Sequence, residues 1–225
     1  MRLIKYLRFL LNLSTTSGHV KNFLRQLPVD SCGEPVPWYT YPAIDYLSNL
    51  DFSDARIFEF GTGQSTLFWE RRAREVIAVD LEAEWVEFVR ARTASAGTRV
   101  LHRPAEHDFV SAIEEPGGLF DVVVVDSKPR NLALPAAMSR LSEDGVIIFD
   151  NSDWYPELFR RIRSQQDSLV VDFHGYSPGA IRPYTTSLIF RRSFYRNVLH
   201  SHFVPPGGKL IRSEHDRPTR TQDNP

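Results

Sequence analysis

Residues 57–66 of the chain read Ile57-Phe58-Glu59-Phe60-Gly61-Thr62-Gly63-Gln64-Ser65-Thr66. The first four are a short apolar run of β-forming side chains, and two glycines, spaced two apart, interrupt the chain directly after them. This pattern predicts a strand, a tight glycine turn and a helix over Ser65–Arg72. A second apolar run, Glu75–Asp80, predicts a strand that ends in a carboxylate. Such a turn lets a ligand approach the backbone closely, and the carboxylate can accept both hydroxyls of a ribose.

Two nucleoside cofactors fit a turn of this kind. The nicotinamide fingerprint requires a third glycine three residues after the second, and this chain has Thr66 there. The acid two residues before the first glycine, near the mouth of the sheet, would be a natural partner for a ligand ammonium. This order of features along the chain resembles the S-adenosylmethionine site of the class I methyltransferases: an acid, a glycine turn, and a carboxylate at the end of the next strand. The resemblance implies a set of cofactor-binding residues: Glu59, Gly61, Thr62, Gly63, Ser65 and Asp80.

The composition predicts a globular chain with one sizeable domain, since 42% of its 225 residues are hydrophobic and 24% are charged. A net charge of -1 gives no case for a nucleic acid partner. The single cysteine, Cys32, cannot form an internal disulfide, which favours a reducing, cytoplasmic location. We expect an N-terminal helical segment at residues 1–27, a methyltransferase domain at 28–204 and a disordered, polar tail at 205–225.

The first thirteen residues have the pattern of a basic amphipathic helix. Leucine and isoleucine recur there at helical spacing, Arg2, Lys5 and Arg8 lie between them, and no acid precedes Asp30. Such a helix can lie peripherally on the anionic inner face of a membrane, pack on the domain, or form a homodimer. No apolar run approaches the roughly 20 residues that span a bilayer.

The rest of the chain alternates strand and helix patterns. Apolar β-rich runs predict strands at Thr98–Leu101, Leu119–Asp126, Gly145–Phe149, Leu169–Phe173 and Thr185–Arg191. Helical spacing predicts helices at Ala43–Leu50, Glu82–Ala96, Leu132–Leu141 and Pro156–Gln166. Because no helix pattern separates the last two strands, we expect them to be antiparallel. The fold class is therefore α/β, a Rossmann-like, mostly parallel sheet with an antiparallel final pair and helices on both faces, as in class I methyltransferases.

Polar side chains follow the fourth and fifth predicted strands. Asp126 ends the fourth strand, and Asp150 and Asn151 end the fifth. Adjacent parallel strands lie about 4.8 Å apart, so these side chains can converge beside the cofactor pocket. Carboxylate and amide oxygens are ligands that Mg²⁺ accepts, and a metal there would lower the pKa of an acceptor hydroxyl. The pattern predicts O-methylation of a small molecule or glycan, with Mg²⁺ as an assisting ion.

This second cluster resembles the metal site of the cation-dependent O-methyltransferases, which include the catechol, caffeoyl-coenzyme A and macrocin enzymes. The resemblance implies that Asp126, Asp150 and Asn151 are metal ligands. Those enzymes carry a lysine base three residues after the first metal aspartate, where this chain has Pro129, and Lys128 is the nearest candidate base. A metal-free alternative stays open, in which Asp126 touches cofactor or substrate directly and the Asp-Asn pair caps a turn.

Loops at the same edge supply the remaining candidates. The resemblance places Ala105 and Glu106 beside the adenine. His174 has a suitable side chain for a general base. We expect the acceptor pocket to be walled by the loop over residues 174–179 and by Trp154 and Tyr155. Two other functions stay open, a nicotinamide-dependent oxidoreductase and a catalytically silent methyltransferase-like domain held at a membrane or in a complex.

Overall fold

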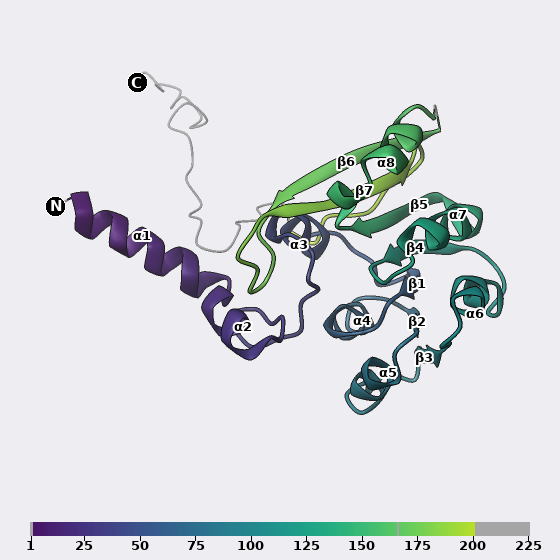
Figure 1. The fold of residues 1–225 in the computed structure, drawn as a ribbon, viewed down its shortest axis with the longest axis horizontal. Coiled ribbons are helices and arrows are strands. Elements are labelled where there is room, and N and C mark those ends of the chain that lie inside the picture. Colours follow the sequence, from purple (N-terminus) through teal and green to yellow (C-terminus); the bar gives the residue numbers. More distant parts are fainter. Residues whose placement is uncertain (1, 166, 201–225) are drawn as a thin grey trace, which may run out of the picture.

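A seven-stranded sheet forms the centre of the computed structural model, which describes residues 2–165 and 167–200 (Figure 1). The strands are β1 (Arg56–Phe60), β2 (Glu75–Asp80), β3 (Thr98–His102), β4 (Phe120–Val125), β5 (Leu141–Asp150), β6 (Ser168–Gly175) and β7 (Tyr184–Arg191). Their order is β3-β2-β1-β4-β5-β7-β6. The first five pair in parallel, and β7 pairs antiparallel with both β5 and β6. The predicted fold class is confirmed, while the tail expected at 205–225 lies outside the described residues.

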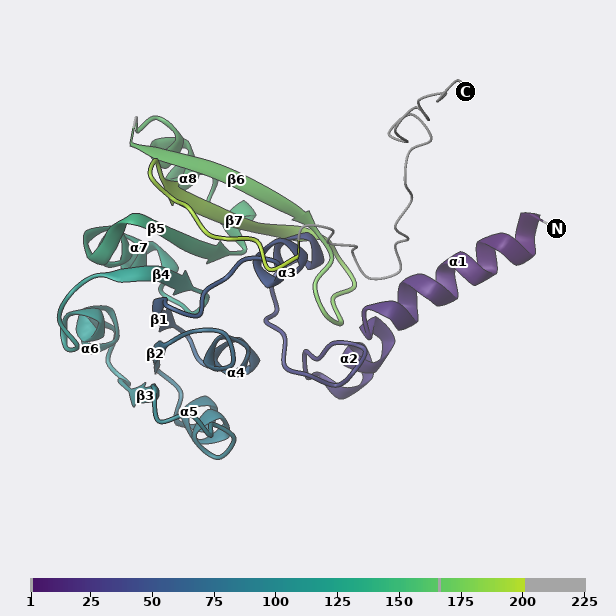
Figure 2. The same cartoon turned by 180° about the vertical axis from the view of Figure 1, so that it is seen from behind.

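Helices cover both faces of this sheet (Figures 1 and 2). They are α1 (Arg2–Thr16), α2 (His19–Arg25), α3 (Tyr41–Ser48), α4 (Gln64–Glu70), α5 (Ala83–Arg90), α6 (Glu106–Ser111), α7 (Arg130–Arg140) and α8 (Pro156–Arg163). Two 3₁₀ turns, η1 (Ala112–Glu114) and η2 (Ser152–Trp154), complete the elements that the structure assigns as helical. Side chains of α3 and α4 pack in one core, and those of α6, α7 and α8 pack in the core on the opposite face.

The central strands are buried on both faces because their side chains alternate between the two cores. On β4, Val122 and Val124 contact the α3 and α4 core, whereas Val123 and Val125 contact the α6, α7 and α8 core. All four are fully buried. This double cover leaves the carboxyl ends of β1, β2, β4 and β5 as the edge where polar groups can reach a ligand.

One predicted helix is shorter because of a contact with another element, and one helix was not predicted. Helix α5 ends at Arg90 instead of Ala96. The carboxylate of Glu70, on α4, accepts hydrogen bonds from the backbone N–H of Ala94 at 2.8 Å and of Ser95 at 3.0 Å. These bonds give the backbone an alternative to continuing the helix. Helix α6 begins at Glu106, within the stretch expected to be a loop.

The predicted N-terminal segment has two parts with different surroundings. Helix α1 extends away from the domain, as both ribbon views show (Figures 1 and 2). Helix α2 lies within the expected helical segment at residues 1–27 and is joined to the chain that follows it through the buried Asn22. The Asn22 amide donates to the carbonyl of Val29 at 2.7 Å and accepts from its N–H at 3.1 Å. Within the described part of the chain, no helix is long and apolar enough to cross a membrane.

Candidate functional site

A cavity of about 470 Å³ lies at the carboxyl edge of the sheet, a volume typical of small-molecule sites. Its walls come from the turn after β1, the ends of β2, β4 and β5, the loop between β6 and β7, and α2. Predicted site residues that line it are Gly61, Thr62, Gly63, Ser65, Asp80, Asp126, Asp150 and Asn151. The structure therefore brings the glycine turn and the second polar cluster into one site.

The turn after β1 and Asp80 form a single hydrogen-bonded unit. The N–H of Thr62 donates to Oδ2 of Asp80 at 2.8 Å, and the N–H of Glu82 donates to Oδ1 at 3.0 Å. Gly61 has φ +117°, and a Cβ there would lie 3.3 Å from Cβ of Ser127. Glycine is therefore required at Gly61 both by backbone conformation and by the close approach of the loop that leaves β4.

Glu59 has a different place from the one the sequence suggested. It is fully buried and does not line the cavity, so it is not positioned to meet a ligand ammonium in this arrangement. Its Oε2 accepts from Oγ1 of Thr66 at 2.6 Å, and its Oε1 has no hydrogen-bond partner among the described residues. Burial raises the pKa of Glu59 to about 8, although hydroxyls of Ser65 and Thr66 oppose the shift. Glu59 supports the turn from beneath it.

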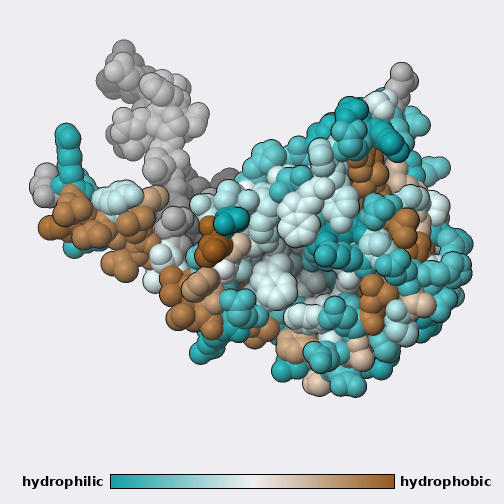
Figure 3. Space-filling model, viewed as in Figure 1, coloured by the Kyte–Doolittle hydropathy of each residue, from teal (hydrophilic) through white to brown (hydrophobic). Residues whose placement is uncertain are grey.

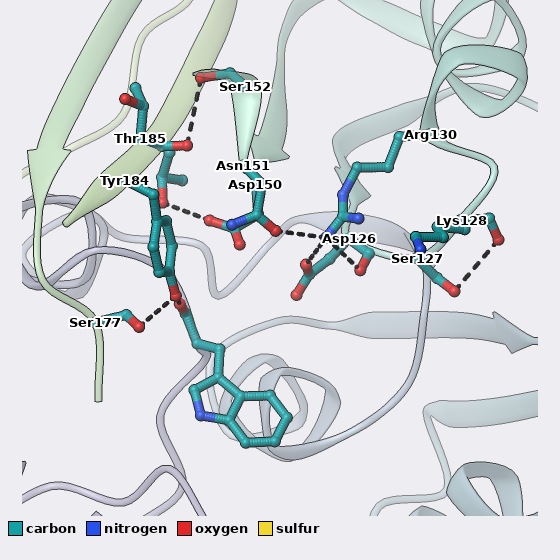
Figure 4. Close-up of polar contacts among 12 residues, drawn as sticks. Asp126, Ser127, Lys128, Arg130, Asp150, Asn151, Ser152, Ser177, Tyr184 and Thr185 are labelled. Carbon is teal, nitrogen blue, oxygen red and sulfur yellow. Dashed lines mark hydrogen bonds and ion pairs between the residues drawn. The ribbon is translucent and has the colours of Figure 1, made fainter. Parts of the chain in front are cut away.

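Two of the three expected metal ligands, Asp126 and Asn151, bind a guanidinium group instead (Figure 4). Nη2 of Arg130 donates to Oδ1 of Asp126 at 2.9 Å and to Oδ1 of Asn151 at 2.9 Å. Arg130 is 6% exposed and comes from the first residue of α7, four positions after Asp126. The described residues contain no group of three or more acidic, histidine or cysteine side chains that could hold a metal ion. In this arrangement the donor set does not fit Mg²⁺, because a fixed cation already bridges two of the three predicted ligands.

Asp150 is the third member of that predicted set and is bonded separately. It is 2% exposed, and its Oδ1 accepts from Oγ1 of Thr186 on β7 at 2.6 Å. Burial and the nearby Asp126 raise the pKa of Asp150 well above its ordinary value. Burial also raises the pKa of Asp126, with the Arg130 guanidinium opposing the shift. A raised pKa makes a carboxylate a stronger proton acceptor once it is ionised, so both groups are candidates for proton transfer.

Besides the buried Glu59, four predicted residues lie outside the cavity, and each is exposed: Lys128, His174, Ala105 and Glu106. Lys128 lies in the loop after β4. Asp126 and Ser127 of the same loop line the cavity, but Lys128 does not. Nδ1 of His174 lies 2.8 Å from Oγ1 of Thr185, its neighbour across the β6–β7 pair. Neither predicted base is therefore placed to reach a ligand here. Ala105 and Glu106 cap and begin α6, beyond the cavity wall.

Several lining residues were missed or only partly expected. Of the predicted acceptor walls, Trp154, Ser177, Pro178 and Gly179 line the cavity, and Tyr155 does not, since its ring packs on Phe149. Missed residues include Asn22, Gln26, Trp85, Arg130 and Tyr184.

The indole rings of Trp38 and Trp85 meet edge to face with centroids 6.1 Å apart. The hydroxyl of Tyr184 donates to the carbonyl of Trp38 at 2.8 Å and also contacts Ser177. For Arg130, the signal in the sequence was a basic residue four positions after an acid, in Asp126-Ser-Lys-Pro-Arg130.

Neither a protein-family model nor a curated protein sequence matches the chain. Solved structures do match. The O-methyltransferase TomG from Streptomyces achromogenes, in complex with S-adenosylmethionine, is 15% identical, with a TM-score of 0.54 over 80% of this chain and 89% of that one. A "putative O-methyltransferase" from Klebsiella pneumoniae is 15% identical, with a TM-score of 0.52 over 67% of this chain and 77% of that one. A "putative rRNA-methylase" from Clostridium thermocellum is 11% identical, with a TM-score of 0.51 over 71% and 99%. The chain has the fold that these methyltransferases share.

Proposed function

We propose that the chain is an S-adenosylmethionine-dependent methyltransferase that acts on a hydroxyl of a small molecule or glycan. One observation supports the proposal most strongly. The turn at Gly61, which Asp80 holds by a hydrogen bond, lines the same cavity as Asp126 and Asp150. The turn leaves backbone close to the cavity, and the remaining lone pairs of Asp80 can accept ribose hydroxyls. That TomG holds S-adenosylmethionine on a similar fold supports the same cofactor here.

The charge of the cavity favours a cationic cofactor. Four of its lining residues are acidic, namely Asp80, Glu82, Asp126 and Asp150, and Arg130 is the one lysine or arginine among the described lining residues. A sulfonium cation gains from this field, whereas phosphates are repelled by it. This argues against a nicotinamide dinucleotide and against a nucleic acid acceptor, although one structural neighbour is described as an rRNA methylase.

The nicotinamide alternative meets a second obstacle at the third glycine position. Thr66 is fully buried there, its hydroxyl donates to Glu59, and it accepts from the N–H of Gly63 at 3.1 Å. In nicotinamide-binding folds the third glycine lets the helix pack close to the strand. Here the Thr66 side chain occupies that position and holds the turn by hydrogen bonds instead.

The site suggests how the acceptor is activated without a metal. When bound, S-adenosylmethionine supplies an electrophilic methyl carbon. We assign Asp150 as the base that takes the proton of the acceptor hydroxyl, because it lines the cavity and its carboxylate is held by Thr186. Arg130 keeps Asp126 and Asn151 in fixed orientations beside it. Ordering of these groups before the substrate arrives lowers the cost of reaching the reactive geometry.

Calorimetric titration with S-adenosylhomocysteine, with NAD as the control ligand, tests the cofactor assignment. We expect saturable binding of S-adenosylhomocysteine only, at least about tenfold weaker in Asp80→Ala, which loses charged hydrogen bonds to the turn. Glu106→Gln is the matched control, because Glu106 lies outside the cavity, and should bind as the wild type does. Binding of NAD alone would overturn the proposal. Cofactor binding without turnover on a broad panel of hydroxylated acceptors would favour the silent domain.

A further inference from the structure

We infer that α1 and α2 dock this protein on an anionic lipid surface. Large apolar side chains of both helices are exposed to solvent: Leu3, Ile4, Tyr6, Leu7, Phe9, Leu10, Leu11, Val20, Phe23 and Leu24. In the space-filling view they form a band along α1 that continues onto α2 (Figure 3). Every residue from Arg2 to Asn12 is exposed, so α1 gains little from packing on the domain. An apolar surface of this kind marks a site of interaction.

The two sides of α1 have opposite character. Residues three and four apart share a helix face, so Leu3, Leu7 and Leu10 lie on one side, and Lys5 and Arg8 lie on another. An apolar face opposite a basic face is the arrangement of helices that lie in the plane of a membrane interface. The apolar side chains enter the acyl boundary while the basic ones reach the headgroups.

Charge decides between a lipid surface and a second copy of the chain. Residues 1–29 contain Arg2, Lys5, Arg8, Lys21 and Arg25 and no acid. A second copy packed on the apolar face would leave Lys5 and Arg8 on the opposite side of α1, where residues 1–29 supply no acid to pair with them. Anionic headgroups supply the opposite charge over an extended surface, so each basic residue adds to binding there.

The length of α1 sets its orientation. Its 15 residues rise about 22 Å, less than the roughly 30 Å of a hydrocarbon core. The helix therefore lies on the surface, in agreement with the lack of a spanning helix in the described residues. Helix α2 continues this surface, and its residue Asn22 and the following Gln26 lie in the cavity wall. Docking through both helices would hold the candidate site beside the membrane.

Flotation of the whole chain with vesicles tests this inference without any activity measurement. Vesicles of phosphatidylcholine alone are compared with vesicles that also contain phosphatidylglycerol, at low and high salt. We expect binding to the anionic vesicles, weakened by salt because headgroup attraction is screened. Leu7→Asp with Leu11→Asp should lower the partition coefficient at least about tenfold, because two apolar side chains no longer enter the acyl boundary. Lys5→Glu with Arg8→Glu should remove the preference for anionic lipid.

Matched controls separate α1 from general surface effects. Leu132 is 49% exposed on α7, so Leu132→Asp repeats the chemical change elsewhere and should float as the wild type does. Arg161→Glu, at an exposed position on α8, is the control for charge reversal. Circular dichroism confirms that each variant is folded. Failure of the wild type to float, or equal flotation of the Leu7 and Leu11 variant, would overturn the inference. So would sedimentation showing a dimer that the same variant converts to a monomer, since the apolar face would then be covered by a second copy.

Discussion

Nη2 of Arg130 donates a hydrogen bond to Oδ1 of Asn151 at 2.9 Å, across the gap between the ends of β4 and β5. The same nitrogen donates to Oδ1 of Asp126 at 2.9 Å. A guanidinium stays protonated in proteins, so this link is a permanent positive charge at the point where a divalent cation was expected. The charge determines what the second polar cluster can do, both for metal dependence and for stability.

Methyl transfer should not require a divalent metal. If Arg130 provides the positive charge between Asp126 and Asn151, turnover in excess EDTA should equal turnover in Mg²⁺. A radiochemical assay on any accepted substrate measures both rates. Loss of activity in EDTA that Mg²⁺ restores would show that Arg130 moves aside to admit a metal.

Replacing Arg130 with Met should destabilise the fold. The substitution keeps much of the apolar stem and leaves the mostly buried Asp126 without its ion pair, at a cost of about 3 kcal/mol in the free energy of unfolding. Urea denaturation should show a lower midpoint with an unchanged slope. Arg160→Met is the control, because that side chain is 72% exposed and its loss should cost less than about 0.5 kcal/mol. Equal midpoints for wild type and Arg130→Met would contradict the structural role.

Among the candidate bases, Asp150 should dominate. Asp150→Asn keeps an oxygen that can accept from Thr186 but removes the proton acceptor, so kcat should fall about 10²- to 10⁴-fold with S-adenosylhomocysteine affinity unchanged. Lys128→Met and His174→Gln should retain most activity, because both side chains lie outside the cavity. A large loss of kcat in either of these two variants, with Asp150→Asn near wild type, would reverse the assignment.

The two glycines of the turn should respond differently to alanine. Gly61→Ala meets a positive φ of +117° and a contact of 3.3 Å with Cβ of Ser127, so it should cost about 1–3 kcal/mol and weaken cofactor binding. Gly63→Ala should be milder, since φ there is 164° and the nearest atom to an added Cβ, on Trp85, is 4.0 Å away. Thermal unfolding and calorimetry measure the two effects. Equal losses in both variants would show that the constraint on the turn is not specific to Gly61.

Glu59 should make stability fall as the pH rises. Its pKa is about 8 in the folded protein and about 4.5 when unfolded, so the folded state holds a proton that the unfolded state releases. The contribution is fully present below about pH 4.5 and is lost as the pH rises through about 8, a change of as much as about 5 kcal/mol. Glu59→Gln cannot ionise, so its stability relative to wild type should increase from pH 5 to pH 9. Parallel pH profiles for the two proteins would refute a raised pKa.

Much of the fold could be predicted because it rests on local patterns. The apolar runs at β1, β2 and β4 are long enough to be recognised as buried strands, and the missing crossover before β7 indicates an antiparallel end. Helix ends were less predictable. The end of α5 depends on Glu70, a residue of another helix, whose carboxylate takes backbone N–H groups that the local pattern assigned to α5.

The sequence by itself determined that Gly61, Asp80, Asp126 and Asp150 meet at one edge, since parallel strands that alternate with helices all end there. Only the tertiary structure decided what lies between them. Whether a side chain after a strand enters the cavity depends on the path of each loop and on contacts between distant elements, which periodicity does not encode. These contacts place Arg130 between the polar groups, bury Glu59 beneath the turn, bring Asn22 of α2 into the wall, and leave Lys128 outside it.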